Sequence, residues 1–528
     1  MSETYDIVVA GGGHNSLVCA GYLAKAGLRV LVLEARDIIG GNTVTEELTI
    51  PGFWHDSCSS AHALIQSSPT IRNDELGLKA YGLRYLFPDP VVTMPFDDGS
   101  SLTMWRDIDR TVAEFSRFSK RDGETYRRMM AEYDSIKVIF GRYNYTPIGY
   151  GPALDEALLE RPDGALWLRR YRQSALEIID EYFEEEHVRA FMAWMAFMTV
   201  QAIDRPHTGR LAYALANGRQ NVSWTTPVGG SGALPKALVA MIEDHGGAVL
   251  AGKPVTELIL AGGRCTGVVT RDGETYHAAK AVVSTIHIKH LVEMAPQEDW
   301  GQSFVAGVEQ WQPGFTLFAA HYALSEPPLY LIDGERRPSV AAGTAGSVDN
   351  MLRLGSDFKR GLIHQDDPVL LVVCSSVVDE TRAPAGQHTL KILSFFPYEL
   401  ADGGPARWDE IKAEVAQRNL EYLRRFAPNL TGDVILDSHI ESSLDLSRRN
   451  PHNWHGSCHA GELSPAQAGA MRPVPGWASH RMPIPGLYQT GATTHPGGSV
   501  SAGPGRNAAW VLLDDLGMSL EGVIHNPV

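Results

Sequence analysis

The chain has 528 residues, of which 44% are apolar and 20% are charged, a composition typical of a folded globular protein. Its length predicts roughly two to four domains. The formal net charge of -16 disfavours nucleic acid and anionic membrane surfaces as partners, because phosphate recognition needs a basic surface. The five cysteines are scattered without a C-x-x-C spacing, so they indicate neither a disulfide framework nor a redox-active thiol pair.

The N-terminal segment predicts a strand, a glycine turn and a helix. Asp6–Ala10 is a short apolar run, typical of a parallel strand that is buried on both faces. Gly11 permits the tight turn that follows, and Gly13 leaves room for a pyrophosphate beside the backbone. A helix predicted over Ser16–Ala26 would point its N-terminal amides at that anion.

A carboxylate follows the second strand of this unit. The strand is predicted over residues 28–33, and Glu34 stands at its end, roughly twenty residues after the turn. There it can accept hydrogen bonds from both ribose hydroxyls of an adenosine. Ser16 replaces the third glycine of the G-x-G-x-x-G pattern, and its small side chain still allows close packing of helix on strand. The unit predicts dinucleotide binding, with an ordinary glycine turn as the alternative, and does not separate FAD from NAD.

A second glycine pair, Gly40 and Gly41, makes the nucleotide-binding pattern more specific. The residues concerned are Glu34, Ala35, Gly40, Gly41, Asn42, Thr43 and Thr45. They resemble the N-terminal signature of the glutathione-reductase-type FAD flavoproteins, especially the phytoene desaturase-like branch. That branch includes carotenoid isomerases, retinol saturase and pyridine nucleotide-disulfide oxidoreductase domain-containing relatives. The resemblance implies FAD as cofactor, with the glycine pair near its ribityl and pyrophosphate groups.

The segment of residues 54–63 has two interpretations. In similar proteins residues 54–63 pass near the flavin, so His55, Asp56 and His62 are candidates for the wall of the active site. The alternative is that these side chains satisfy backbone groups of a loop.

From Trp105 to about Ala216 the pattern is helical, with amphipathic helices predicted over Asp107–Phe118 and Ala175–Phe183. In the resembled family this insertion would form a lid over an apolar site. Its most apolar window, Ala190–Val200, is shorter than the roughly twenty residues of a bilayer span. It predicts a buried helix. A membrane-dipping surface, with peripheral membrane contact, and a substrate channel are the alternatives.

The chain then returns to the nucleotide domain. Pro227–Pro235 leads into a helix predicted over Lys236–His245, and this block resembles the GG-x-G-x-L segment of the same flavoproteins. The resemblance places the backbone of Val255 against adenine. A hairpin predicted over Arg264–Tyr276 and a buried strand over Ala281–Thr285 follow.

Later runs predict a mixed sheet without a second glycine fingerprint. Strands are expected over Phe315–Ala323, Val369–Val373 and Thr389–Phe396, and a helix over Trp408–Phe426. The predicted fold class is α/β, with a discontinuous Rossmann-like FAD-binding domain, a helical insertion and a mixed-sheet substrate domain. The expected FAD-binding segments are 1–100, 222–300 and 480–528, the helical substrate or lid region is 101–221, and the mixed-sheet domain is 301–479.

A histidine-rich cluster precedes the last block: His452, His455, Cys458 and His459. These side chains could bind zinc, but Pro451, Asn453 and Gly456 interrupt the local geometry and no second ligand cluster follows, so no metal is predicted. His459, Glu462, Gln467 and Arg472 resemble the HGE…Q…RP segment of the desaturase-like family. Arg472 is a candidate to bind a substrate carboxylate or carbonyl, with a structural salt bridge as the alternative.

The C-terminal block points to the cofactor. A strand over Pro485–Thr490, a glycine-rich turn over Gly491–Gly505 and a helix over Arg506–Leu516 can present amides to a second part of the same ligand. The turn resembles the C-terminal FAD motif of carotenoid desaturases, including Ala492 in place of the aspartate of other relatives. The implied contacts are Gly491, Thr494, Pro496, Gly497, Gly498, Ser499 and Val500.

The leading hypothesis is an FAD-dependent dehydrogenase that desaturates a C–C bond of an apolar, alicyclic or isoprenoid-type molecule. Hydride would pass to flavin N5 and the electrons to oxygen or a quinone. Removal of a proton from the neighbouring carbon could involve His495, His459 or His62, or no side chain at all. The alternatives are a flavin amine oxidase, a redox-neutral isomerase and a non-catalytic FAD-binding scaffold.

Only Met1–Tyr5 precede the first predicted strand, so no secretory signal is expected and the expected location is the cytoplasm. The sequence leaves the oligomeric state open.

Overall fold

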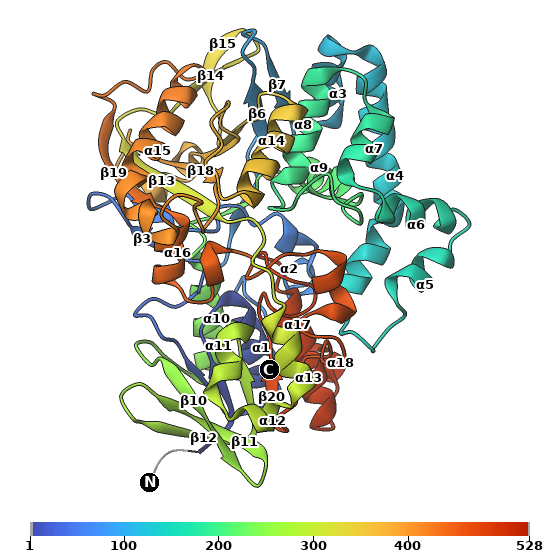
Figure 1. Cartoon of the computed structure of the whole chain (residues 1–528), viewed down its shortest axis with the longest axis vertical. Coiled ribbons are helices and arrows are strands. Elements are labelled where there is room, and N and C mark those ends of the chain that lie inside the picture. Colours follow the sequence, from blue (N-terminus) through green and yellow to red (C-terminus); the bar gives the residue numbers. More distant parts are fainter. Residues whose placement is uncertain (1–3, 526–528) are drawn as a thin grey trace.

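The computed structural model describes residues 4–525 and has a β-sheet towards each end of the molecule (Figure 1). The lower sheet in that view has the strand order β10-β11-β12-β1-β2-β9, and β20 lies beside β12. Its strands are β1 (Thr4–Ala10), β2 (Val30–Leu33), β9 (Ala248–Leu250), β10 (Val255–Ala261), β11 (Arg264–Thr270), β12 (Thr275–Ser284) and β20 (Leu487–Gln489). β1 is parallel to both of its neighbours, as the unbroken apolar run predicts.

Helices cover both faces of this sheet. One face packs on α1 (His14–Lys25), α10 (Ala233–Asp244) and α17 (Gly503–Asp515), and α18 (Leu520–His525) lies beside them. The other face packs on the segment that contains α11 (Ile288–Leu291), α12 (Gln297–Trp300) and α13 (Gln302–Glu309). The doubly covered, mostly parallel sheet agrees with the predicted Rossmann-like arrangement.

One predicted strand boundary differs from the structure. The sequence predicts a hairpin ending at Tyr276 and a separate strand from Ala281, whereas β12 is a single strand of 10 residues. Its first half pairs antiparallel with β11, and its second half pairs parallel with β1, where Ala281 lies opposite Ile7. The chain therefore passes from hairpin to central sheet without leaving the extended conformation.

The upper sheet is the predicted mixed sheet, with the order β19-β13-β18-β17-β16-β6-β7. Its strands are β6 (Val92–Pro95), β7 (Ser101–Met104), β13 (Leu317–Leu324), β16 (Ala341–Thr344), β17 (Leu370–Val373), β18 (His388–Phe395) and β19 (Ile435–Glu441). The β6–β7 hairpin joins this sheet by pairing with β16, so the predicted domain boundary at residue 100 falls inside the hairpin. The helix α15 (Trp408–Arg424) packs on one face.

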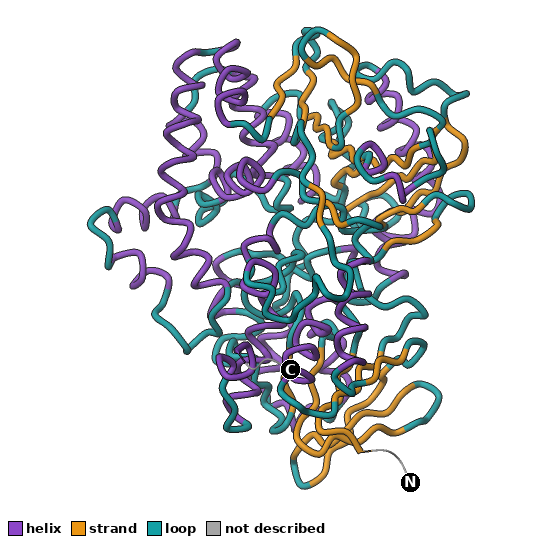
Figure 2. The backbone as a smooth tube through the Cα atoms, turned by 180° about the vertical axis from the view of Figure 1, so that it is seen from behind, coloured by secondary structure: helices purple, strands orange, loops and turns teal. Residues whose placement is uncertain are grey.

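Helices of the 101–221 insertion stand beside the upper sheet, and Figure 2 shows this separation of helix and strand from behind. They are α3 (Ile108–Phe118), α4 (Lys120–Asn144), α5 (Leu154–Leu159), α6 (Gly164–Arg172), α7 (Ala175–Tyr182), α8 (Glu186–Phe197) and α9 (Leu211–Val222). The apolar window predicted as a buried helix is α8, whose Trp194 packs against Gly343 of β16 and is fully buried. Within residues 4–525, no helix has the length and apolar character needed to cross a membrane.

The described chain has three further α-helices and six further strands. They are the helices α2 (Pro69–Arg72), α14 (Val348–Lys359) and α16 (Ser443–Arg449), and the strands β3 (Thr45–Glu47), β4 (Trp54–Asp56), β5 (Tyr85–Leu86), β8 (Thr226–Pro227), β14 (Leu329–Ile332) and β15 (Glu335–Pro338).

Candidate functional site

A cavity of about 1400 Å³ connects the two sheets. At the lower sheet it is lined by the glycine turn after β1 and by Glu34 after β2. At the upper sheet it reaches Leu317, Leu371 and Leu393, and α9 forms another part of the wall. Its volume exceeds the roughly 300–1,000 Å³ typical of a single small-molecule site, so it can hold a dinucleotide and a second molecule.

Two helix N-termini meet at the lower end of this cavity. The first turn of α1 has no side-chain cap, which leaves its amides available to a ligand, whereas in α17 the Gly503 amide donates to the Ser501 hydroxyl at 3.3 Å and Pro504 has no N–H. Gly505 of α17 touches α1, because a Cβ there would lie 2.1 Å from the backbone oxygen of Asn15. The two helices can approach this closely only because position 505 has no side chain, and together they can bind a large anion.

The Glu34 carboxylate is held beside the glycine turn. Its Oε2 accepts a hydrogen bond from the Gly12 amide at 2.6 Å, and its Oε1 accepts one from the Arg36 amide at 2.9 Å. The residue is 7% exposed and lines the cavity. This position fits the predicted contact with an adenosine ribose, because carboxylate oxygens can accept further hydrogen bonds from hydroxyls.

Ser16 also stabilises the glycine turn through its hydroxyl group. Its hydroxyl donates to the backbone oxygen of Gly11 at 2.6 Å or to that of Gly13 at 2.8 Å, which ties the turn to the start of α1. Behind the turn, the Gly40 amide donates to Gly12 O at 2.9 Å, and a Cβ on Gly41 would lie 3.1 Å from the Gly13 Cα. The two glycine segments therefore pack backbone against backbone.

Most of the predicted cofactor contacts line the cavity: Gly11, Gly13, Glu34, Ala35, Gly41, Asn42, Thr43, Val255, Gly491, Pro496, Gly497, Gly498, Ser499 and Val500. The others, Ser16, Gly40 and Thr494, stand just behind the lining. The Thr494 hydroxyl donates to Gly491 O at 2.9 Å and so fixes the C-terminal turn. Direct contact of each residue with the cofactor stays a prediction.

His14 is a cavity residue that the sequence reasoning missed. Its Nδ1 is 2.9 Å from Thr43 Oγ1 and its Nε2 is 3.2 Å from Ser499 O, so it links the N-terminal and C-terminal cofactor segments. Burial lowers the pKa of His14 to about 4, so the ring is neutral at physiological pH. Its position as the first residue of the helix after three glycines was the available signal.

The three candidate catalytic histidines lie in different surroundings. His459 lines the cavity, and burial lowers its pKa to about 4. His495 lies outside the cavity lining, with its Nε2 2.9 Å from Tyr143 O of α4. His62 also lies outside it, with its Nε2 3.1 Å from Ser231 Oγ. Of these three histidines, His459 alone lines the cavity, and its catalytic role stays a prediction.

Two further wall candidates also face away from the cavity. His55 Nε2 is 2.9 Å from Thr49 Oγ1, and burial lowers the His55 pKa to about 3. Asp56 forms a buried ion pair with Arg382 at 3.1 Å and accepts a hydrogen bond from the Ser231 amide at 2.8 Å. These contacts match the alternative interpretation, in which the side chains satisfy buried groups.

The histidine-rich cluster does not converge on a metal site. The His452 ring lies 5.7 Å from that of His287, whereas the His455 ring stacks on Tyr398 at 4.7 Å. Within the described residues, no group of three or more His, Cys, Asp or Glu side chains is placed to hold a metal ion.

Cys458 lies beside Cys58, and both are free thiols. Its thiol forms a hydrogen bond with that of Cys58, and both residues line the cavity. The spacing of the cysteines gave no sign of this pair.

Arg472 forms no salt bridge within residues 4–525, so the expected ion pair is replaced by bonds to backbone oxygens. The residue is fully buried outside the cavity lining, and its guanidinium donates to backbone oxygens of His459, Glu462, Gln467 and Ala492. It also lies over Trp311, 4.7 Å from the ring centroid. Arg472 thus fixes the turn that carries His459 against the C-terminal cofactor segment.

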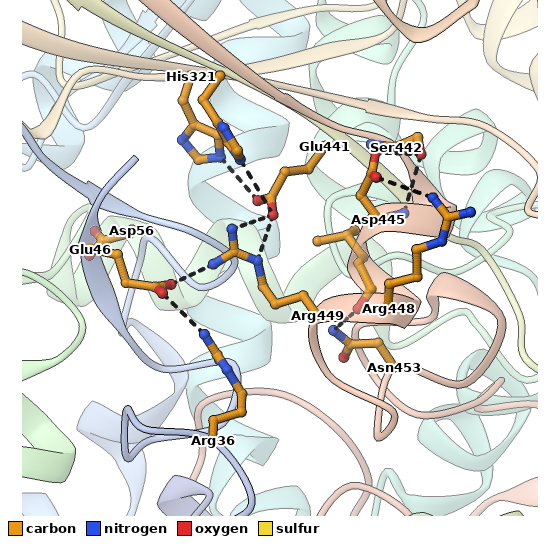
Figure 3. Close-up of polar contacts among 12 residues, drawn as sticks. Arg36, Glu46, Asp56, His321, Glu441, Ser442, Asp445, Arg448, Arg449 and Asn453 are labelled. Carbon is orange, nitrogen blue, oxygen red and sulfur yellow. Dashed lines mark hydrogen bonds and ion pairs between the residues drawn. The ribbon is translucent and has the colours of Figure 1, made fainter. Parts of the chain in front are cut away.

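A partly buried charge network joins the cofactor end to the upper sheet (Figure 3). Glu46 pairs with Arg36 at 3.1 Å and with Arg449 at 2.6 Å. Arg449 also pairs with Glu441 of β19 at 2.5 Å, and Glu441 lies 3.8 Å from His321 of β13. The Arg36 amide donates a hydrogen bond to Glu34. The network therefore connects the Glu34 carboxylate, at the expected ribose position, with the floor of the cavity.

The comparisons with known proteins cover almost the whole chain. A family model described as "Flavin containing amine oxidoreductase" matches residues 17–512. Pyridine nucleotide-disulfide oxidoreductase domain-containing protein 2 of Rattus norvegicus is 28% identical, covering 98% of this chain and 94% of its own. A limonene dehydrogenase polypeptide of Castellaniella defragrans is 26% identical, covering 98% of this chain and 95% of its own.

Two further proteins are similar at lower sequence identity. Phytoene desaturase (lycopene-forming) of Pseudescherichia vulneris is 24% identical, covering 96% of this chain and 99% of its own. A putrescine oxidase triple mutant of known structure shares the fold, with a TM-score of 0.63 at 14% identity, covering 97% of this chain and 98% of its own.

The predicted fold class, cofactor and enzyme class are confirmed by these matches. The paired helix N-termini, the bare glycine turns and the ribose-side carboxylate fit FAD, so the protein is an FAD-dependent oxidoreductase. The chain belongs to the flavin containing amine oxidoreductase family.

Proposed function

We propose that this enzyme dehydrogenates a C–C bond of an apolar small molecule, with an alicyclic or isoprenoid-type skeleton, and passes the electrons to oxygen or a quinone. The observation that carries the proposal is the distribution of charge around the cavity. Within residues 4–525, the carboxylates that line it belong to Glu34 and Glu293. Both lie at the lower sheet, Glu34 after β2 and Glu293 in a turn that contacts β10.

The upper part of the cavity is apolar, and no carboxylate from residues 4–525 lines it. Its walls include Met198, Leu215, Leu317, Leu371 and Leu393, which favour an apolar skeleton. Arginines of the α9 segment line the same region, namely Arg210 and Arg219. A protonated amine would meet like charge without a carboxylate to bind it, which disfavours C–N oxidation of a cationic substrate.

His459 can take up the proton in this reaction. When bound, FAD supplies a hydride acceptor at N5. Burial lowers the pKa of His459 to about 4, so the ring is neutral at pH 7 but is a weak base. It could accept a proton from the carbon next to the site of oxidation as loss of the hydride makes that C–H group acidic. Arg472 orients this residue through its hydrogen bond to the backbone oxygen of His459 at 3.3 Å.

The class of substrate can be tested by reduction of the bound flavin. We expect anaerobic mixing with cyclic ketones, cyclic acids or isoprenoids to bleach the flavin absorbance, and mixing with primary and secondary amines to leave it unchanged. Stopped-flow absorbance spectroscopy measures this. Bleaching by amines alone would overturn the proposal in favour of an amine oxidase, and activity only after prior reduction, without net electron output, would identify an isomerase.

Glu34→Ala should weaken FAD binding by about 10- to 100-fold, because it removes a charged hydrogen-bond acceptor worth about 1.5–3 kcal/mol. Titration of the apoprotein with FAD, followed by flavin fluorescence, gives the dissociation constant. Glu34→Gln keeps the shape and one acceptor oxygen, so it should bind FAD with an intermediate affinity. Equal affinity of Glu34→Ala and the wild type would refute the ribose contact.

A further inference from the structure

We propose that Arg219 binds a carboxylate of the substrate, so that the apolar molecule dehydrogenated here is an acid. The inference rests on the proposed function for the reaction, but the binding site itself is defined by the structure. Arg219 belongs to α9, is 4% exposed and lines the cavity.

The Arg219 guanidinium has no anionic partner within the described chain. Its hydrogen bonds there are limited to one from Nη1 to the sulfur of Met195, at 3.0 Å, and its Nε is buried without a partner. A buried cation without a counter-ion is costly, because desolvation is not repaid by a hydrogen-bonded charge. The cavity is the direction from which a counter-ion can arrive.

Two other arginines on the cavity wall have side-chain partners. Arg506 binds Glu75 through Nε at 2.8 Å and Nη2 at 3.2 Å. Arg210 donates to the Tyr133 hydroxyl at 3.1 Å and lies over the Phe140 ring. Arg219 differs from both, because it combines deep burial with unused donors.

Indole rings position the Arg219 side chain. The guanidinium carbon lies 4.1 Å from the Trp224 ring centroid and 5.7 Å from that of Trp194. Trp194 is fixed in turn by a hydrogen bond from its Nε1 to Leu370 O at 3.0 Å. These contacts hold the planar group in place without using its hydrogen-bond donors, which suits two-point binding of a carboxylate.

The chemistry of the surrounding wall defines the rest of the ligand. Met198, Leu215 and Leu371 contribute apolar surface to the same cavity. A molecule with one carboxylate and a hydrocarbon skeleton would satisfy both features. A neutral hydrocarbon would leave the Arg219 donors unsatisfied, and a free inorganic anion would leave the apolar wall uncovered.

The experiment compares matched acids and alcohols on the FAD-loaded protein. The probes are cyclohexanecarboxylate against cyclohexylmethanol and decanoate against decanol, with dissociation constants measured anaerobically by calorimetry. We expect the acids to bind at least about tenfold more tightly than the alcohols. Arg219→Gln should abolish this preference, whereas Arg219→Lys should retain part of it.

A control variant separates this effect from a general loss of structure. Arg418 is another largely buried arginine with unused donors, over Phe396 at 5.6 Å and outside the cavity lining, so Arg418→Gln should leave the preference for acids intact. Melting temperature and flavin content report on the folding of each variant. If Arg219→Gln does not fold, Arg219→Lys and the wild type still decide the result.

The result also separates this inference from the proposed reaction. Preferential binding of acids without flavin reduction would support the anion site and count against dehydrogenation of these acids. Flavin reduction by neutral apolar compounds, with no preference for acids, would support the reaction and overturn the anion site. Equal binding of acids and alcohols by the wild type, or an unchanged preference in Arg219→Gln, would likewise overturn it.

Discussion

We expect the Gly505→Ala variant to lose most of its bound flavin. The new methyl group would lie 2.1 Å from Asn15 O and 2.9 Å from the Val18 Cβ, so α17 and α1 would have to move apart. Overpacking of this kind costs about 1–3 kcal/mol of stability. It would also shift the turns before the two helices, which we expect to contact the cofactor, so the affinity for FAD should fall at least about tenfold.

The ratio of absorbance at the flavin band to that of the protein, together with FAD titration of the apoprotein, measures this effect. The matched control is Gly355→Ala in α14, where a Cβ would meet no atom within 4 Å. Alanine should raise the stability there by about 0.5–1 kcal/mol, because glycine is a poor helix former, and leave the flavin content unchanged. Full flavin content in Gly505→Ala would show that the helices do not need this contact.

The protein should lose stability steeply as the pH falls below about 6.5. Six histidines are at most 2% exposed and have lowered pKa values, chiefly because burial disfavours the charged ring: His55, His62, His287, His321, His480 and His495. Their stabilising contribution is complete above the unfolded pKa of 6.5 and is lost as the pH falls towards the folded values.

The size of this effect follows from the number of protons taken up on unfolding. Each histidine that is protonated only in the unfolded chain removes about 1.4 kcal/mol of stability per pH unit. Six such sites would exhaust a typical unfolding free energy of about 5–15 kcal/mol within roughly two pH units. We therefore expect the melting temperature to drop by about 7 °C between pH 7.5 and pH 5.5.

Circular dichroism melts across this pH range test the prediction. His480→Asn should give a shallower pH dependence, because it removes one buried ring from a residue outside the cavity, at a backbone φ of 66° that asparagine tolerates. The matched control is His207→Asn, which changes an exposed ring at a similar backbone φ of 67°. A melting temperature that is constant from pH 7.5 to pH 5.5 would contradict the buried-histidine argument.

Local chemistry explains why much of the cofactor site was predictable. The turn at Gly11 and Gly13, the carboxylate of Glu34 and the second turn from Gly491 onwards each need particular residue types at fixed spacings. Such requirements are visible in a single sequence. The central strands were equally visible, since β1 and β13 are buried apolar runs.

The unpredicted features depend on contacts between distant segments. Cys58 meets Cys458, and His14 meets Ser499, only after both glycine turns have folded around one cavity. Arg219 looked like an ordinary helix residue, because its isolation from carboxylates is a property of the packed structure. The β6–β7 hairpin was assigned by its position in the chain, whereas pairing with β16 decides its sheet.

The contact between α1 and α17 has a consequence for biosynthesis. A ribosome releases the Gly11 turn long before Gly505, and at about 5–20 residues per second the interval lasts on the order of tens of seconds. During that time α1 lacks a partner that covers it in the finished protein. Cofactor insertion must therefore wait until the last part of the described chain has been synthesised, and a nascent chain stopped before α17 would expose apolar surface to chaperones and proteases.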